Sequence, residues 1–232
     1  MAKKRMREAE KSSKKTQAQA KSNERKRRAE ALRRAREREE EMEAQDAPKI
    51  YQIKVILAGS KPQIWRRIEV SAECTLKTLR QIIATVMDWD GLHLHEFKIG
   101  RKTYGNPEFD ADFSDLRVLD EGDVTLHELG LRTKSKFSYR YDFGDNWEHT
   151  LLVENVLEED PTTQYPVCTG GEMAAPPDDC GGLWGYYQLQ EILDNPADPE
   201  YEELREWFGG ELDATAFDVE AINRRLDRLR QR

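Results

Sequence analysis

The stretch Ile50-Tyr-Gln-Ile-Lys-Val-Ile-Leu57 decides the fold, because large apolar side chains recur at every second position, at Tyr51, Ile53, Val55 and Leu57. A period of two places these side chains on one face of a β-strand. Residues 58–62 supply the Gly, Ser and Pro that are typical of a turn, and residues 63–70 predict a second strand. Residues 50–70 therefore predict a β-hairpin with a longer loop.

The spacing changes to that of a helix after this hairpin. Apolar residues recur three and four positions apart from Leu76 to Val86, and Thr75 is in place to cap the helix N-terminus. Further strands are expected at 94–100, 136–143 and 147–156, and helices at about 186–194, 199–208 and 215–230. The sequence thus predicts an α+β fold with a mixed or antiparallel sheet, a β-grasp-like start of hairpin then helix, and C-terminal helices.

Composition divides the chain into an N-terminal arm, residues 1–48, and a body, residues 49–232. The arm has no Phe, Trp, Tyr, Ile or Val, and Leu32 is its one large aliphatic residue. Such a segment buries too little apolar surface to offset the entropy of ordering the chain. We expect a disordered arm or an isolated helix, and a body that forms one domain.

Charge is unevenly distributed along the chain. Residues 1–28 carry twelve Lys or Arg against three Glu, whereas the net charge of the whole chain is −8. A polyanion is therefore expected to contact the arm, with weak and salt-sensitive nucleic-acid affinity. The basic residues expected to contact phosphates are Lys3, Lys4, Arg5, Lys14, Lys15, Arg25, Lys26, Arg27 and Arg28.

No apolar run approaches the length of a membrane-spanning helix, and no apolar segment follows the basic N-terminus. We therefore expect a cytoplasmic protein without a membrane partner, whose three cysteines are reduced thiols. Familiar catalytic motifs, such as Gly-x-Ser-x-Gly and His-Glu-x-x-His, do not occur. Several enzyme classes therefore find no support in the sequence.

The segment Tyr139-Arg-Tyr-Asp-Phe-Gly-Asp-Asn-Trp-Glu-His149 predicts two aromatic-rich strands joined by a tight turn. Gly144 and Asn146 suit the positive φ angles of such a turn. Alternatively, Asp142, Asp145 and His149 converge at the end of the hairpin. Carboxylates with an imidazole suit a divalent metal or acid–base chemistry.

Residues 160–186 hold four Pro, five Gly and two Cys, which predicts a long ordered loop rather than regular structure. We expect this loop to pack over the 141–149 hairpin and to bury Trp147 or Trp184 between them. Its thiols are either buried anchors or ligands of a zinc ion. The candidate metal ligands are Asp145, His149, Cys168, Asp179 and Cys180, with Asp178 as an alternative to Asp179.

Two further pairs have alternative interpretations. His93 and His95 share a face at strand spacing, which permits joint metal ligation or merely local hydrogen bonds. Arg66 and Arg67 beside Trp65 either contact a nucleic-acid backbone or form an ordinary exposed strand surface.

Four motifs resemble, in their order, those of the plasmid pRiA4b ORF-3-like family, whose members are also labelled passenger TnpR-like proteins of an insertion element. The motifs are Ile64-Trp-Arg-Arg-Ile-Glu-Val70, Leu92-His-Leu-His-Glu-Phe97, Tyr141-Asp-Phe-Gly-Asp-Asn-Trp-Glu-His149 and Pro176-Pro-Asp-Asp-Cys-Gly-Gly182. The resemblance covers about residues 50–226 and differs from the usual pattern at Asp178, where a longer Glu is common. The structural motif residues that it marks are Trp65, Arg66, His95, Gly144, Trp147, Gly181 and Gly182.

The resemblance implies an α+β domain of plasmids and mobile elements whose activity is unestablished. The pattern of a serine recombinase, a nucleophilic Ser with an Arg cluster, is missing. We therefore expect a non-enzymatic binding module, with a protein partner for the acidic body and nucleic acid for the arm. The alternative is a metal-dependent enzyme or zinc-stabilised domain.

Overall fold

The computed structural model describes residues 30, 33–34, 49–110 and 118–231. The chain divides into two compact units, Met1–Ala47 and Pro48–Arg232. Residues 30, 33 and 34 of the first unit are helical, and an exposed ion pair one turn apart joins Arg34 to Glu30. The nine basic residues predicted to contact nucleic acid lie outside the described residues.

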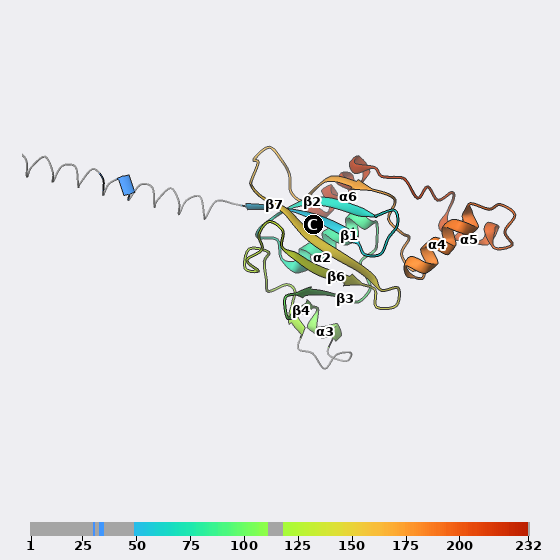
Figure 1. Cartoon of the computed structure of the whole chain (residues 1–232), viewed down its shortest axis with the longest axis horizontal. Helices are drawn as coiled ribbons and strands as arrows, with labels where there is room; N and C mark the ends of the chain where they lie inside the picture. The colour runs from blue at the N-terminus through green and yellow to red at the C-terminus, as the bar shows by residue number, and fades with distance from the viewer. Residues whose placement is uncertain (1–29, 31–32, 35–48, 111–117, 232) are drawn as a thin grey trace, which may run out of the picture. The chain divides into compact units, whose positions relative to one another are not determined.

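An eight-stranded sheet, in the order β5-β4-β3-β6-β7-β1-β2-β8, organises the described part of the second unit (Figure 1). Neighbouring strands are antiparallel except β4 and β5, which are parallel, so the sheet is mixed. The strands are β1 (Lys49–Leu57), β2 (Trp65–Ser71), β3 (His95–Ile99), β4 (Lys102–Gly105), β5 (Val118–Asp120), β6 (Lys136–Tyr141), β7 (Trp147–Glu158) and β8 (Val167–Glu172). The predicted α+β class and opening hairpin are confirmed.

The helices of this unit are α2 (Leu76–Met87), α3 (Pro107–Asp110), α4 (Gly182–Leu193), α5 (Tyr201–Phe208) and α6 (Val219–Arg230). The side chain of Thr75 accepts a hydrogen bond from the amide of Thr78, which confirms it as the cap of α2. Figure 1 shows α4 and α5 to one side of the sheet, and Tyr186 of α4 is buried in the core. None of the described helices combines the length and apolar character needed to cross a bilayer.

The core forms where the period-two pattern of the strands meets the apolar face of α2. Tyr51, Ile53, Val55 and Leu57 are buried on β1, as are Trp147, His149, Leu151 and Val153 on β7. Each large apolar side chain buried in this way contributes on the order of 1.5–3 kcal/mol to folding. The alternation seen in the sequence therefore assigns the buried face of both strands correctly.

Arg66 is not available to contact nucleic acid, because only 3 % of it is exposed. It joins backbone segments inside the domain instead. Its guanidinium donates hydrogen bonds to the carbonyl oxygens of Val86, Trp65 and Glu172 and lies over the ring of Phe217. Burial lowers the pKa of Arg66 to about 10, so the side chain stays charged at neutral pH. Arg67 pairs instead with Glu154 and lies over the ring of Trp65.

Residues 160–186 contain more regular structure than predicted. They include β8 and the first residues of α4. Gly171 permits β8 at this edge of the sheet, because a Cβ there would lie 2.3 Å from the ring of Phe217. The expected docking is confirmed: the amide of Gly181 donates to Asp145 in the 141–149 hairpin, and Trp147 is fully buried. Trp184, the other candidate for burial, is 77 % exposed.

We predict that Arg66→Ala lowers the free energy of unfolding by about 2–4 kcal/mol, because three backbone carbonyls lose a buried charged donor. Arg67→Ala is the matched control and should cost about 1 kcal/mol or less, as its ion pair is partly solvated. Urea denaturation of the three proteins measures both values. Equal losses for the two variants would show that the hydrogen bonds of Arg66 to these three carbonyls do not stabilise the domain more than the surface ion pair of Arg67 does.

Candidate metal centre

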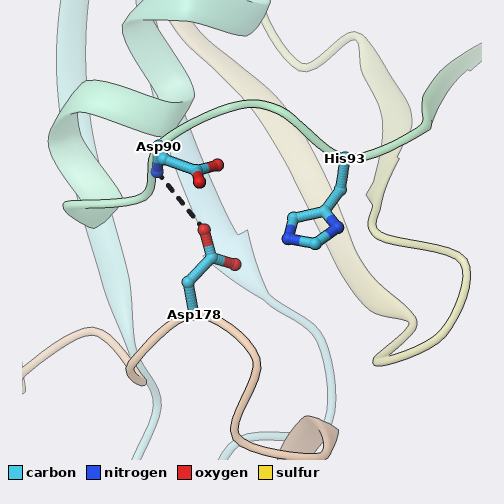
Figure 2. A group of neighbouring side chains, drawn as sticks. All are labelled: Asp90, His93 and Asp178. Atoms are coloured by element: carbon cyan, nitrogen blue, oxygen red, sulfur yellow. Dashed lines mark hydrogen bonds between the residues drawn. The ribbon is translucent and has the colours of Figure 1, made fainter.

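His93 lies where three segments of the domain meet. They are the loop after α2, the end of β6 and the Gly- and Pro-rich segment before α4. Among the described residues, two groups of three bring their candidate ligand atoms within 4.8 Å of one another. The inner group is Asp90, His93 and Asp178, drawn in Figure 2, and the outer group is His93, Asp142 and Asp179.

The inner group is held by hydrogen bonds to the two aspartates. The hydroxyl of Tyr141 lies 3.2 Å from Oδ1 of Asp90 and 3.2 Å from Oδ2 of Asp178. The backbone amide of Asp90 donates to the same Oδ2 of Asp178, at 3.3 Å. The amide of Leu92 donates to Oδ1 of Asp90, at 2.8 Å. Both carboxylates are therefore oriented before any ligand arrives.

The other carboxylate oxygen of Asp178, Oδ1, is buried and has no hydrogen-bond partner among the described residues. Figure 2 shows it on the side of the carboxylate that faces the His93 ring. A buried oxygen without a partner is costly, and native proteins rarely leave one unexplained. Burial, with a contribution from the charge of Asp90, raises the pKa of Asp178. The inner group thus offers an unused acceptor.

The outer group is more open to solvent. Nε2 of His93 lies 3.2 Å from Oδ1 of Asp179, and Nδ1 lies 3.8 Å from Oδ2 of Asp142. The side chain of Asp179 is 67 % exposed, whereas that of Asp142 is largely buried and also accepts a hydrogen bond from the amide of Gly144. Both aspartates have positive φ angles, which Asp tolerates better than most residues.

Negative charge dominates around His93. Burial opposes its protonation, but the combined charges of Asp142, Asp179, Asp178 and Asp90 outweigh that effect and raise its pKa. One imidazolium compensates at most one of four carboxylates. An arrangement of this kind favours a cation of higher charge.

An aromatic stack supports the site. Trp89 stacks on Tyr141, with ring centroids 5.0 Å apart, and on Trp147, at 5.6 Å. Its indole Nε1 donates to the carbonyl oxygen of Pro176, at 2.9 Å. Trp89 therefore joins the loop that bears Asp90 to the hairpin and to the segment that bears Asp178.

The ligand set predicted from the sequence is not brought together. Asp179 belongs to the outer group, whereas Asp145 accepts the hydrogen bond from Gly181. His149 is 1 % exposed, and burial lowers its pKa to about 4, so it is a neutral core residue. Burial raises the pKa of the Cys180 thiol to about 12 and also raises that of Cys168. Neither cysteine nor His149 belongs to a ligand group among the described residues.

The sheet order explains this separation. His149 lies on β7 and Cys168 on β8, and strands β1 and β2 lie between them. Three strand spacings separate their backbones by about 14 Å. Alternate residues of β7 also face the core, and His149 is one of them. Spacing along the chain carries no information about this order.

His93 and His95 do not act together in either ligand group. Nε2 of His95 lies 2.9 Å from Oε2 of Glu121. The other carboxylate oxygen of Glu121, Oε1, lies 3.4 Å from Nε of Arg80. His93 and His95 both line a cavity of about 270 Å³ with Lys77, Arg80, Asn106 and Glu121. This cavity leaves room for a small ligand beside the two candidate ligand groups.

Asp90 is not among the metal ligands predicted from the sequence, and Asp178 is predicted there only as an alternative to Asp179. Asp90 follows Trp89 immediately after a helix and precedes His93 by three residues. That local spacing is the one available signal. Asp178 lies 85 positions after His93, and only the docked loop brings the two together.

Comparison with known proteins places this fold and its motifs in one family. Residues 49–223 match the family model of the plasmid pRiA4b ORF-3-like protein. The chain is 32 % identical over 182 residues to the uncharacterized protein y4hQ of Sinorhizobium fredii, covering 78 % of this chain and 92 % of that protein. The chain belongs to the plasmid pRiA4b ORF-3-like family.

A solved structure agrees with this assignment. The crystal structure of the protein of unknown function MM3350 from Methanosarcina mazei Go1 matches with a TM-score of 0.65 and 34 % identity. The match covers 75 % of this chain and 97 % of that one. Neither relative has an assigned function, so any activity has to be argued from the site.

We predict that Gly182→Ala destabilises the domain by about 1–3 kcal/mol more than Gly209→Ala. Both glycines have positive φ, but a Cβ at Gly182 would lie 2.5 Å from the carbonyl oxygen of Asp145, whereas nothing lies within 4 Å at Gly209. Thermal and urea unfolding test this difference. Equal losses would mean that the close approach of loop and hairpin is not required.

Proposed function

We propose that this domain binds one divalent cation through Asp90, His93 and Asp178. The observation that carries the proposal is the buried, unpartnered Oδ1 of Asp178 on the side facing His93. A cation there would satisfy that oxygen and offset the repulsion among the carboxylates. Asp142 and Asp179 support the ion electrostatically from the outer side of His93.

The ligand chemistry selects among cations. One imidazole with carboxylates suits Mn²⁺ or Zn²⁺ better than the thiolate-rich zinc site considered from the sequence. Three protein ligands leave coordination positions for water or a second ligand, as in catalytic rather than closed structural sites. The neighbouring cavity, with Lys77 and Arg80 in its wall, suits an anionic group of that second ligand.

The predicted nucleic-acid affinity of the arm rests on charge alone and stays a prediction. The charge of residues 1–28 supports it, and the acidic remainder of the chain restricts it to that segment. Arg66 and Arg67 add nothing to it, because their side chains are committed to contacts within the domain.

We predict that the full-length protein, stripped with a chelator, binds one Mn²⁺ per chain and that Asp178→Asn weakens binding at least tenfold. The substitution removes the charge of the unpartnered carboxylate while Tyr141 and the Asp90 amide retain an acceptor. It should also raise the melting temperature of the chelated protein by a few degrees, because the metal-free site loses repulsion.

Isothermal titration calorimetry and thermal unfolding with and without MnCl₂ measure both effects. Asp123→Asn, an exposed carboxylate outside both groups, is the matched control and should bind as the wild type does. A repeat with ZnCl₂ compares the two metals. Identical Mn²⁺ and Zn²⁺ affinities in Asp178→Asn and wild type, or no binding of either metal, would refute the proposal.

We further predict that cation binding strengthens as pH rises through the pKa of His93, because the ion displaces its proton. In the metal-free protein the effect on stability has the opposite direction. The pKa of His93 is higher in the folded state, so its contribution is complete below its ordinary value of 6.5 and is lost as pH rises through the folded value.

Denaturation of the chelated protein between about pH 5 and 9 tests this direction. His93→Gln should remove the pH-dependent part, whereas His127→Gln, an exposed histidine outside both groups, should keep it. If His93→Gln retains the wild-type pH profile, the charge coupling at this site is not significant.

A further inference from the structure

A second cavity, of about 480 Å³, lies between helices α4 and α5 and has two exposed tryptophans in its wall. We call this open cavity the groove. Trp184 on α4 is 77 % exposed and Trp207 on α5 is 51 % exposed. Leu189, Ile192 and Leu204 extend the apolar lining. Two large exposed aromatic side chains in one groove are uncommon on a surface that faces only water.

The short helix α5 is incompletely covered by its own domain. None of its eight residues is buried, although Tyr201, Leu204 and Phe208 give it a partly covered apolar face. Isolated helices of this length are not stable in water and depend on packing. A partner seated between α4 and α5 would complete that packing.

The groove is lined by negatively charged side chains. Asp179, Glu200 and Glu203 line it, and no Lys or Arg is among its described lining residues. From Gly182 to Phe208 the chain carries seven acidic residues and one basic residue, Arg205, which pairs with Glu202 at 3.7 Å. Exposed indole faces beside carboxylates favour a cationic side chain, through cation–π and charge interactions.

We infer that this groove docks a basic peptide segment of a protein partner, with an Arg or Lys side chain in contact with Trp184 and Trp207. Its volume is that of a pocket for a small ligand or an anchoring side chain. Charge complementarity decides the occupant, because nucleic acid and anionic membranes are repelled by the acidic lining. The groove shares only Asp179 with the metal centre, so the inference stands apart from the proposed cation binding.

The test measures binding of the full-length protein, in chelator, to a fluorescein-labelled peptide of about twelve residues. The peptide carries four arginines spaced by Ala and Leu, and a second peptide has citrulline at the same positions. Fluorescence anisotropy should show binding of the arginine peptide and at least fivefold weaker binding of the neutral one. Trp184→Ala, Trp207→Ala and the double substitution Glu200→Gln with Glu203→Gln should each weaken binding at least fivefold.

Two matched controls separate docking from general attraction. Glu191→Gln removes an exposed charge of α4 that does not line the cavity and should leave affinity within twofold. Trp184→Phe keeps an aromatic face and should bind more tightly than Trp184→Ala. Because Trp184 is mostly exposed, its substitution should leave the melting temperature unchanged.

Equal binding of the arginine and citrulline peptides would overturn the inference, as would wild-type affinity in Trp184→Ala. Asp178→Asn should bind the arginine peptide as the wild type does, since Asp178 does not line the groove. Failure of metal binding and failure of peptide docking are therefore distinguishable.

Discussion

The contact on which the rest of this structure depends is the stack of Trp89 against Tyr141 and Trp147, with its indole nitrogen bonded to the carbonyl of Pro176. Each aromatic pair contributes on the order of 0.5–1.5 kcal/mol beyond its buried area. The geometric consequence is larger than the energetic one. Three segments far apart in the chain are joined at one buried ring, and each of them carries carboxylates toward His93.

This joint brings like charges closer than they would lie in an unconstrained chain. The raised pKa of His93 reports that proximity, because the charges of the surrounding carboxylates outweigh the effect of burial. The pKa of Asp178 is raised mainly by burial, with a smaller contribution from the charge of Asp90. Without a cation, the repulsion among the carboxylates destabilises the folded state, and the aromatic stack and the hairpin contacts offset it. The proposed cation would offset this repulsion and, by binding only the folded state, would stabilise the domain.

The segment before α4 has two chemical faces. On one side Asp178 and Asp179 face His93, and on the other Asp179 and Cys180 line the groove beneath Trp184. Gly182, the first residue of α4, makes this arrangement possible, because it approaches the backbone of the 141–149 hairpin where no Cβ fits. The proposed ligand of the groove and the proposed cation at His93 would therefore both contact this one short segment.

The sequence by itself determined the elements whose signal is local. Alternation along 50–57 and 147–153 assigned the buried face of β1 and β7, and Thr75 marked the start of α2. Gly144 and Asn146 marked the turn of the hairpin, but only Asn146 has the positive φ that was predicted for both. It also identified that the Gly- and Pro-rich segment packs on this hairpin, because so long a segment needs buried anchors. The tertiary structure alone decided which polar residues meet: His149 turned into the core, β1 and β2 came between it and Cys168, and Asp90 and Asp178 met at His93. Side-chain periodicity specifies the face of one element, whereas a site depends on the order and docking of several, which no local pattern encodes.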